Sequence, residues 1–166
     1  MNKFVLMGVA GCGKTSIGEA LAPRIDAKFI DGDALHPQSN IDKMAGGQPL
    51  GDDDRWPWLE LVGAALAESR GTTIIGCSAL KRRYRDAIRK AAGDDVCFVH
   101  LSGSRELIQG RMSARKGHFM PPALLDSQFA ALELPEADET ALTVDISGTE
   151  AEIVEQIVKH MEAMTS

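Results

Sequence analysis

The stretch that decides the fold runs from Gly8 to Thr15 and has the sequence Gly-Val-Ala-Gly-Cys-Gly-Lys-Thr. It fits the pattern G-x-x-x-x-G-K-[ST], in which glycines let the backbone curl so that its N–H groups point at phosphate oxygens. A short apolar run precedes it at 4–7, and a helical pattern follows it at about 16–24. This strand–loop–helix order predicts a phosphate-binding P-loop, and it makes a chance glycine-rich turn the weaker interpretation.

The P-loop predicts a role for each of its polar groups. Lys14 supplies a mobile positive charge to the β- and γ-phosphates of a nucleotide, and the hydroxyl of Thr15 can ligate Mg²⁺. The partial positive charge at the N-terminus of the following helix adds to the attraction for phosphate. The residues expected to hold ATP are therefore Gly8, Gly11, Cys12, Gly13, Lys14, Thr15 and Ser16.

The composition indicates one small domain over 1–166. Of its 166 residues, 44% are hydrophobic, and no apolar run approaches the length of a membrane span, so we expect no membrane partner. Three cysteines in an unpatterned spacing argue against a disulfide framework or a zinc site and for the reducing cytosol. The N-terminal apolar stretch is short and ends in the P-loop, unlike a signal peptide, so we expect a cytoplasmic protein.

Charge is unevenly distributed along the chain. The formal net charge is −6, yet residues 81–118 contain ten of the 18 Lys and Arg residues and only four of the 24 Asp and Glu residues. A basic block in an acidic protein favours binding of a small anion, although any single charge in it can equally belong to a solvated helix face. Since no broad basic face or aromatic platform accompanies the block, we expect no nucleic-acid partner.

Apolar strand-like runs alternate with helical patterns along the chain. The runs lie at 3–8, 28–32, 72–77, 96–101 and 142–146. Helical periodicity covers about 16–24, 57–69, 80–92, 104–115 and 121–132. A last helix begins at a capping box formed by Thr149 and Glu152. The alternation predicts an α/β fold with a parallel sheet covered on both faces, which binds ligands beyond the carboxyl ends of its strands.

Two carboxylates, Asp31 and Asp33, end the second predicted strand. Residues two apart on a strand point to the same face, so both side chains can reach one ligand. A phosphotransferase needs a group that takes the proton of the attacking hydroxyl, and carboxylates near Mg²⁺, and the pair suits those two tasks. The alternative is a simple turn, because Asp-Gly-Asp is also good turn chemistry.

The segment at about 33–60 is rich in hydrogen-bond donors and lacks a continuous core pattern. Such a segment suits a polyhydroxylated or anionic acceptor, for which His36 is a candidate ligand. The run Asp52–Asp54 reads equally well as a helix start whose acids complement the dipole, with Pro57 in the first turn. The same dipole disfavours Arg55 at this place, which favours a binding role for that side chain.

Three cations, Lys81–Arg83, fall in the first turn of a helix that is predicted to start near Ser78. They oppose the helix dipole by roughly a few tenths of a kcal/mol each, which a bound anion would offset. The alternative is that their side chains simply extend into solvent. Because Lys81 lies nearest the strand end, we expect it to be a ligand.

A lid is predicted at about 111–125. Arg111 and Arg115 lie four residues apart, on one face of a helix, and Gly117 permits a hinge before the next helix. Closure of such a helix–loop–helix would exclude water and bring positive charge to the transferring phosphoryl group. A surface helix with ordinary charges is the alternative.

Taken together, the motifs resemble those of the gluconokinases, P-loop kinases that act on a carbohydrate. The matched segments cover nearly all of the chain and include DGD at 31–33 with LHP at 35–37, CSALK at 77–81, and HFM at 118–120 with SQF at 127–129. The resemblance implies transfer of the γ-phosphate of ATP, with Mg²⁺, to the 6-hydroxyl of D-gluconate. It also implies a P-loop kinase fold with a five-stranded parallel sheet flanked by helices on both faces, a small helical lid and a homodimer.

Site roles follow from the residues and the resemblance together. Thr15 would bind Mg²⁺, Asp31 would do so through water, and Asp33 would accept the proton of the acceptor hydroxyl. The predicted catalytic groups are Lys14, Asp33, Arg111 and Arg115. The predicted gluconate ligands are Asp33, His36, Lys43, Arg55, Lys81 and Gln128.

Without the resemblance, the residues indicate a small-molecule phosphotransferase but not its acceptor. A kinase of the shikimate or nucleoside-monophosphate type would share the P-loop and the pair of acids. A non-catalytic regulator would bind ATP with no acceptor at all, an interpretation that the paired acids and the donor-rich segment disfavour.

Overall fold

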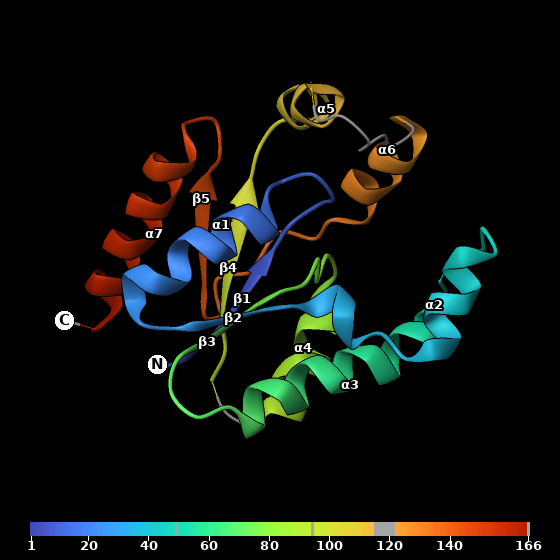
Figure 1. Cartoon of the computed structure of the whole chain (residues 1–166), viewed down its shortest axis with the longest axis horizontal. Helices are drawn as coiled ribbons and strands as arrows, with labels where there is room; N and C mark the ends of the chain where they lie inside the picture. Colours follow the sequence, from blue (N-terminus) through green and yellow to red (C-terminus); the bar gives the residue numbers. More distant parts are fainter. Residues whose placement is uncertain (49, 94, 115–121, 166) are drawn as a thin grey trace.

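The computed structural model describes residues 1–48, 50–93, 95–114 and 122–165. Its five strands are β1 (Lys3–Met7), β2 (Lys28–Asp31), β3 (Thr73–Gly76), β4 (Cys97–Ser102) and β5 (Ala141–Asp145). All neighbouring strands pair in parallel, in the order β2-β3-β1-β4-β5 (Figure 1). The five-stranded parallel sheet is thereby confirmed, and each strand differs from its predicted range by at most one residue at either end.

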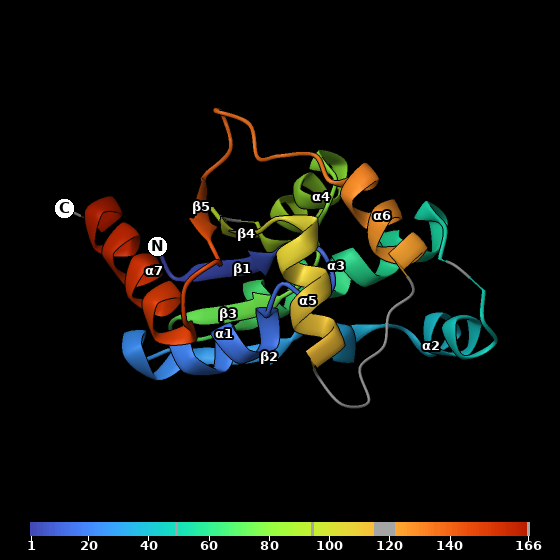
Figure 2. The same cartoon turned by 90° about the horizontal axis from the view of Figure 1, so that it is seen from above.

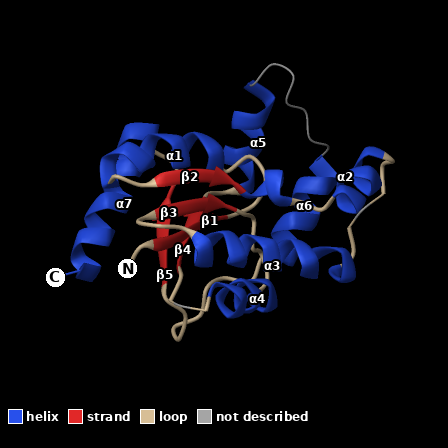
Figure 3. Cartoon of the chain, turned by 60° about the horizontal axis from the view of Figure 1, so that its bottom comes forward, coloured by secondary structure: helices blue, strands red, loops and turns tan. Residues whose placement is uncertain are grey.

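Helices cover both faces of this sheet, as Figure 3 shows. On one face lie α1 (Lys14–Leu21) and α7 (Glu150–Thr165), and on the other α3 (Asp52–Glu68) and α4 (Arg82–Ala92). Three further helices, α2 (Gln38–Ala45), α5 (Arg105–Ala114) and α6 (Pro122–Ala131), lie beyond the carboxyl ends of the strands (Figure 2). No helix in the described part of the chain is both long enough and apolar enough to cross a membrane.

The core is divided by the sheet into two layers. Along β1, Phe4 and Leu6 pack into the layer under α1 and α7, whereas Val5 and Met7 pack into the layer under α3 and α4. All four side chains are at most 5% exposed. A central strand buried on both faces needs an unbroken apolar run rather than an alternating one, which is why 4–7 was recognisable in the sequence.

The helices differ most from the predicted ones at three places. α2 was not predicted, because its only buried residue within the described chain is Asn40 and it therefore carries no apolar stripe. α3 begins at Asp52, so the helix-start interpretation of Asp52–Asp54 is confirmed, but Pro57 lies in the second turn rather than the first. α4 begins at Arg82 rather than near Ser78, because residues 78–81 form a loop before the helix.

Candidate active site

The P-loop connects β1 to α1, as predicted. Gly8, Gly11 and Gly13 all have positive φ angles, of 151°, 83° and 98°. Gly11 has a second reason to be glycine, because a Cβ there would lie 2.5 Å from the Sδ atom of Met112 on α5. The loop therefore curls tightly beneath α5 and leads directly into the N-terminus of α1 at Lys14.

The side chain of Lys14 bends back over this loop. Its Nζ donates to the carbonyl oxygens of Gly8, at 3.0 Å, and Val9, at 3.2 Å, and lies 3.9 Å from the Sγ atom of Cys12. Burial raises the pKa of the Cys12 thiol, more than the charge of Lys14 lowers it. The thiol therefore stays neutral, and Lys14 is the charged group that the loop presents to an anion.

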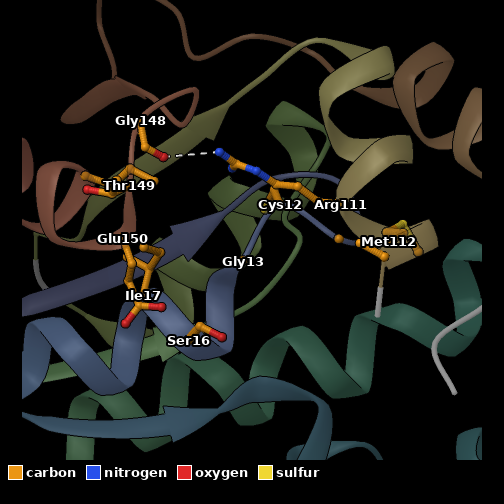
Figure 4. Close-up of a pocket in the computed structure, with 12 residues that line it drawn as sticks. Cys12, Gly13, Ser16, Ile17, Arg111, Met112, Gly148, Thr149 and Glu150 are labelled. Atoms are coloured by element: carbon orange, nitrogen blue, oxygen red, sulfur yellow. Dashed lines mark hydrogen bonds between the residues drawn. The ribbon is translucent and has the colours of Figure 1, made fainter. Parts of the chain in front are cut away.

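A cavity of about 380 Å³ opens beside the P-loop (Figure 4). Its walls are the loop itself, the first turn of α1, the end of α5 and the 148–150 turn, at which α7 begins. Arg111 projects from α5 across the cavity and donates from Nη2 to the carbonyl oxygen of Gly148, at 3.1 Å. The structure thus brings Arg111 together with Gly11, Cys12, Gly13 and Ser16. The predicted partner Arg115 and the hinge Gly117 lie outside the described residues.

The acidic pair forms a turn at the end of β2. Asp31 Oδ1 accepts from the backbone N–H of Asp33, at 3.0 Å, and so begins the 3₁₀ turn Gly32–Leu35. A Cβ on Gly32 would lie 2.3 Å from the carbonyl oxygen of Gly76, so only glycine fits between the two carboxylates. The turn interpretation is therefore confirmed, since Asp31 shapes the turn. Both side chains remain exposed at the strand end, and their roles at Mg²⁺ and at the acceptor stay predictions.

His36 follows this turn and is held as a neutral ring. It stacks on Trp58 with 4.0 Å between ring centroids, and Asn40 Nδ2 lies 3.2 Å from its Nδ1 atom. Because Asn40 Nδ2 also donates to the carbonyl oxygen of Asp54, Nδ1 of His36 is the acceptor and Nε2 carries the proton. Burial lowers the pKa of His36, more than the charge of Asp33 raises it. The ring therefore offers one N–H donor at neutral pH.

A second cavity, of about 310 Å³, lies between α3, α4 and α6. Three predicted ligands line it together: Arg55, Lys81 and Gln128. Arg55 Nη1 lies 3.3 Å from Asp52 Oδ1 and 3.2 Å from the hydroxyl oxygen of Tyr84, which fixes its guanidinium at the cavity wall. The arrangement offers cations and amide donors to a small polar anion.

Gln128 joins the second cavity to the P-loop. Its Oε1 accepts from the backbone N–H of Ala10 in the P-loop, at 2.6 Å, while its side chain lines the second cavity. α6, which carries Gln128, is joined to α5 by an ion pair between Arg105 and Asp126. Gln128 thus contacts both the P-loop and the second cavity, and its contact with an acceptor stays a prediction.

Lys43 does not line this cavity. Its Nζ lies 2.7 Å from Asp54 Oδ2, and that oxygen also accepts from the backbone N–H of Gly51, at 2.8 Å. The hydrogen bond from Lys43 lowers the pKa of Asp54. Lys43 therefore joins α2 to the first turn of α3, and its contact with an acceptor stays a prediction.

The cations at the start of α4 are balanced by carboxylates of the protein. Arg82 Nη1 lies 2.7 Å from Asp138 Oδ1, and Arg83 Nη2 lies 2.6 Å from Asp52 Oδ2. A bound anion is not needed to offset the charges of these two arginines. Lys81 is the N-cap residue of α4, and it lines the second cavity.

Two residues that hold the site were missed as such in the sequence. Trp58 Nε1 donates to the carbonyl oxygen of Gly32, at 2.8 Å, and the hydroxyl of Tyr84 donates to Asp52 Oδ1, at 2.6 Å. The signal that could have identified them is their rarity, since the chain has only two Trp and one Tyr. Buried Trp and Tyr side chains usually have a packing partner for the ring and a hydrogen-bond partner for its polar atom.

Oxygen donors suited to Mg²⁺ lie beyond β1 and β2: the Thr15 hydroxyl and the carboxylates of Asp31 and Asp33. Across the described residues, no group of three or more His, Cys, Asp and Glu could hold a metal by itself. Mg²⁺ keeps several waters and takes other ligands from substrate phosphates, so a sparse set of oxygens is what it requires. The residues present therefore fit Mg²⁺ that binds together with nucleotide phosphates.

Comparisons with known proteins agree with this geometry. A family model described as an AAA domain matches residues 4–135. The thermosensitive gluconokinase of Escherichia coli K12 is 52% identical over 93% of this chain and 84% of its own length. The crystal structure of a gluconokinase from Sinorhizobium meliloti 1021 has a TM-score of 0.85, with 44% identity over 99% of this chain and 98% of that chain.

Likeness to other kinases extends only to the fold. A shikimate kinase from Aquifex aeolicus vf5 has a TM-score of 0.63 but 14% identity, over 98% of both chains. The P-loop kinase fold is thereby confirmed, while the alternative acceptors gain no support. Identity across nearly the whole length, rather than in the P-loop alone, decides the family. This chain belongs to the gluconokinase family of P-loop kinases.

Proposed function

We propose that the chain transfers the γ-phosphoryl group of ATP to the 6-hydroxyl of D-gluconate, giving ADP and 6-phospho-D-gluconate. The observation that carries this proposal is the position of Gln128. Its side chain contacts the P-loop at Ala10 and lines the cavity that holds Arg55 and Lys81. A cavity with cations on its wall, linked to the phosphate loop through Gln128, suits an acceptor with a carboxylate at one end and a hydroxyl at the other.

On the nucleotide side, the P-loop N–H groups and Lys14 hold the β- and γ-phosphates. The nucleoside lies in the cavity lined by Arg111 and the 148–150 turn. Mg²⁺, held by Thr15 and, through water, by Asp31, would neutralise part of the phosphate charge when it is bound. Positioning and charge stabilisation are most of what phosphoryl transfer requires from a protein.

On the acceptor side, Arg55 and Lys81 bind the carboxylate of gluconate, since an Arg fork pairs with both carboxylate oxygens. His36, with its N–H donor, and Gln128 bind hydroxyl groups of gluconate. The 6-hydroxyl oxygen attacks the γ-phosphorus, the bond from that phosphorus to the bridging oxygen of ADP breaks, and the hydroxyl proton passes to Asp33.

Larger-scale features belong to the same proposal. The chain is a single kinase domain over 1–166, its acceptor segment is about 33–60, and its lid is about 111–125. The lid closes with Arg111 and Arg115 towards the phosphates. The enzyme works in the cytoplasm as a homodimer. Light scattering of the purified protein tests the oligomeric state.

A coupled assay of ADP release tests the function directly. Purified protein with ATP and Mg²⁺ receives gluconate, shikimate, a nucleoside monophosphate or no acceptor in parallel. We expect turnover with gluconate alone. D-Glucitol is the matched control, because it keeps the hydroxyl groups of gluconate but lacks the carboxylate that Arg55 and Lys81 would bind. Equal turnover with glucitol would contradict carboxylate recognition, and turnover with none of the acceptors would favour a nucleotide-binding regulator.

A further inference from the structure

A buried ion pair lies behind the wall of the acceptor cavity. Arg85 on α4 is 0% exposed and is among the largest fully buried side chains of the described chain. It binds Glu139 through two parallel hydrogen bonds, Nε to Oε1 at 2.7 Å and Nη2 to Oε2 at 3.1 Å. Glu139 lies in the segment between α6 and β5, far from α4 in the sequence. Nothing in the proposed phosphoryl transfer accounts for this pair.

The third nitrogen of the Arg85 guanidinium, Nη1, reaches the loop that carries Lys81. Nη1 donates to the carbonyl oxygen of Ala79, at 2.9 Å. Ala79 has a φ of 44°, in the left-handed region that a residue with a side chain rarely adopts. Such a conformation persists only where surrounding contacts determine it, and it recurs where a loop serves a site.

The loop at 78–81 is in fact held at three successive carbonyl oxygens. Ser78 accepts from the N–H of Gly8 in the P-loop, at 3.2 Å, and Ala79 accepts from Arg85. Leu80 accepts from the N–H of Glu133, just beyond α6, at 2.7 Å. Each donor comes from a different part of the fold, and only the donor to Ala79 is a side chain. Ser78, Ala79, Leu80 and Lys81 all line the acceptor cavity.

We propose that Arg85, held by Glu139, is the positioning residue of the acceptor site, because it fixes the left-handed turn at Ala79 that presents Lys81 to the substrate. Arg85 touches neither gluconate nor ATP and acts through the loop. The proposal rests on the proposed function, since it concerns how that acceptor is bound. It assigns affinity for the acceptor, and not for the nucleotide, to a pair of residues behind the cavity.

Arg89 offers a matched control. It lies one turn further along α4, and its Nη2 is 2.7 Å from Oε1 of the same Glu139. No hydrogen bond recorded for Arg89 in the described chain reaches the 78–81 loop. Arg85→Gln and Arg89→Gln therefore each remove one of the positive charges near Glu139, but only the first frees the carbonyl oxygen of Ala79.

The test compares KM values for gluconate and for ATP in the parent protein, Arg85→Gln and Arg89→Gln. We expect Arg85→Gln to raise the gluconate KM about tenfold or more and to leave the ATP KM within about twofold, because displacement of a positioning contact acts on one substrate. Arg89→Gln should change neither KM by more than about twofold. Equal effects of both variants, or a parental gluconate KM in Arg85→Gln, would overturn the proposal.

Thermal unfolding of each variant separates folding from positioning. If Arg85→Gln does not fold, Arg85→Lys replaces it, because lysine keeps the charge but cannot bind Glu139 and Ala79 together in a fork. A parental gluconate KM in Arg85→Lys would then overturn the proposal. The parent protein is assayed first: absence of gluconate turnover there would contradict the proposed function itself, and not this positioning role.

Discussion

Two loops at the carboxyl ends of neighbouring strands, the P-loop after β1 and the 78–81 loop after β3, reach their shapes by different means. The P-loop has glycines at its positive φ angles, whereas the 78–81 loop has Ala79. One loop is shaped by its own residues; the other is held by Arg85 and Glu139 from elsewhere in the chain. A conformation that glycine makes easy needs no support, and one that alanine must adopt does.

The same difference separates their chemistry. The P-loop binds through backbone N–H groups and one lysine, so its motif can be read from eight consecutive residues. The acceptor cavity collects Arg55, Lys81 and Gln128 from three separate helices or their ends. Substitutions on the two sides should therefore affect different kinetic constants, and the predictions below run from the largest expected effect to the smallest.

Lys14→Ala should have the largest effect. Lys14 is a point charge on the phosphates, and its Nζ contacts are to loop carbonyls rather than to the core. Loss of one preorganised stabilising group lowers kcat by on the order of 10²–10³. Steady-state kinetics measures the loss, with the exposed Lys90→Ala as control and thermal unfolding as a check of the fold. A near-parental kcat would show that the P-loop is not the catalytic phosphate site.

Asp33→Asn should lower kcat by about 10²-fold while ATP binding is preserved, because Asn keeps the shape but cannot take the proton. A loose transition state needs little early deprotonation, which keeps the effect at the lower end of the usual range. Asp31→Asn should instead shift the Mg²⁺ requirement. Titration of Mg²⁺ in both variants and in the parent tests the two assignments. If excess Mg²⁺ restored the activity of Asp33→Asn but not that of Asp31→Asn, the two roles would have to be exchanged.

Arg55→Ala should raise the gluconate KM by about tenfold and leave the ATP KM nearly unchanged, since one charge-assisted contact to the acceptor is lost. Arg83→Ala is the matched control, because Arg83 pairs with the same Asp52 but does not line the cavity. Both KM values are measured for both variants. An increase confined to the ATP KM in Arg55→Ala would mean that the acceptor cavity has been assigned to the wrong substrate.

Glu139→Gln should show the smallest effect on the gluconate KM, because glutamine keeps an oxygen that can accept from Arg85, and its main effect should be on stability. Burial by itself raises the pKa of Glu139, but hydrogen bonds from Arg85, from the Glu136 N–H and from Arg89 outweigh it and lower the pKa to about 2. The lowered pKa contributes stability that is complete above the ordinary value of 4.5 and is lost as pH falls towards 2. Urea unfolding at pH 7 and pH 3 measures this contribution. The free energy of unfolding should be larger for the parent than for the variant at pH 7, and the difference between them should be smaller at pH 3.

The sequence predicted most of the fold because most of its signals are local. Each strand is an apolar run between turn residues, and Thr149 with Glu152 forms the predicted capping box, with N–H to side-chain oxygen distances of 3.1 and 3.2 Å. α2 escaped prediction because a helix that buries a single asparagine has no apolar period.

The candidate site was predictable to the extent that it depends on residue type. Arg55 and Lys81 stood out as cations that a helix start disfavours, and the structure places both on one cavity. The partners that hold them could not be predicted, since Tyr84 meets Asp52 and Arg85 meets Glu139 only after the chain has folded. A pairing between residues so far apart leaves no pattern in one sequence.

The strand order has a consequence for how the enzyme is made. β1 lies between β3 and β4, whose pairing registers begin at Thr73 and Cys97. A ribosome therefore delivers the central strand and the P-loop first, and their two neighbours only after most of the acceptor segment has been synthesised. Until then the most apolar strand has unpaired backbone on both edges, which favours association with other chains. Nascent β1 is thus the segment that a chaperone would have most reason to cover, and the cavity beside the P-loop is complete only after the residues that follow β5 have emerged.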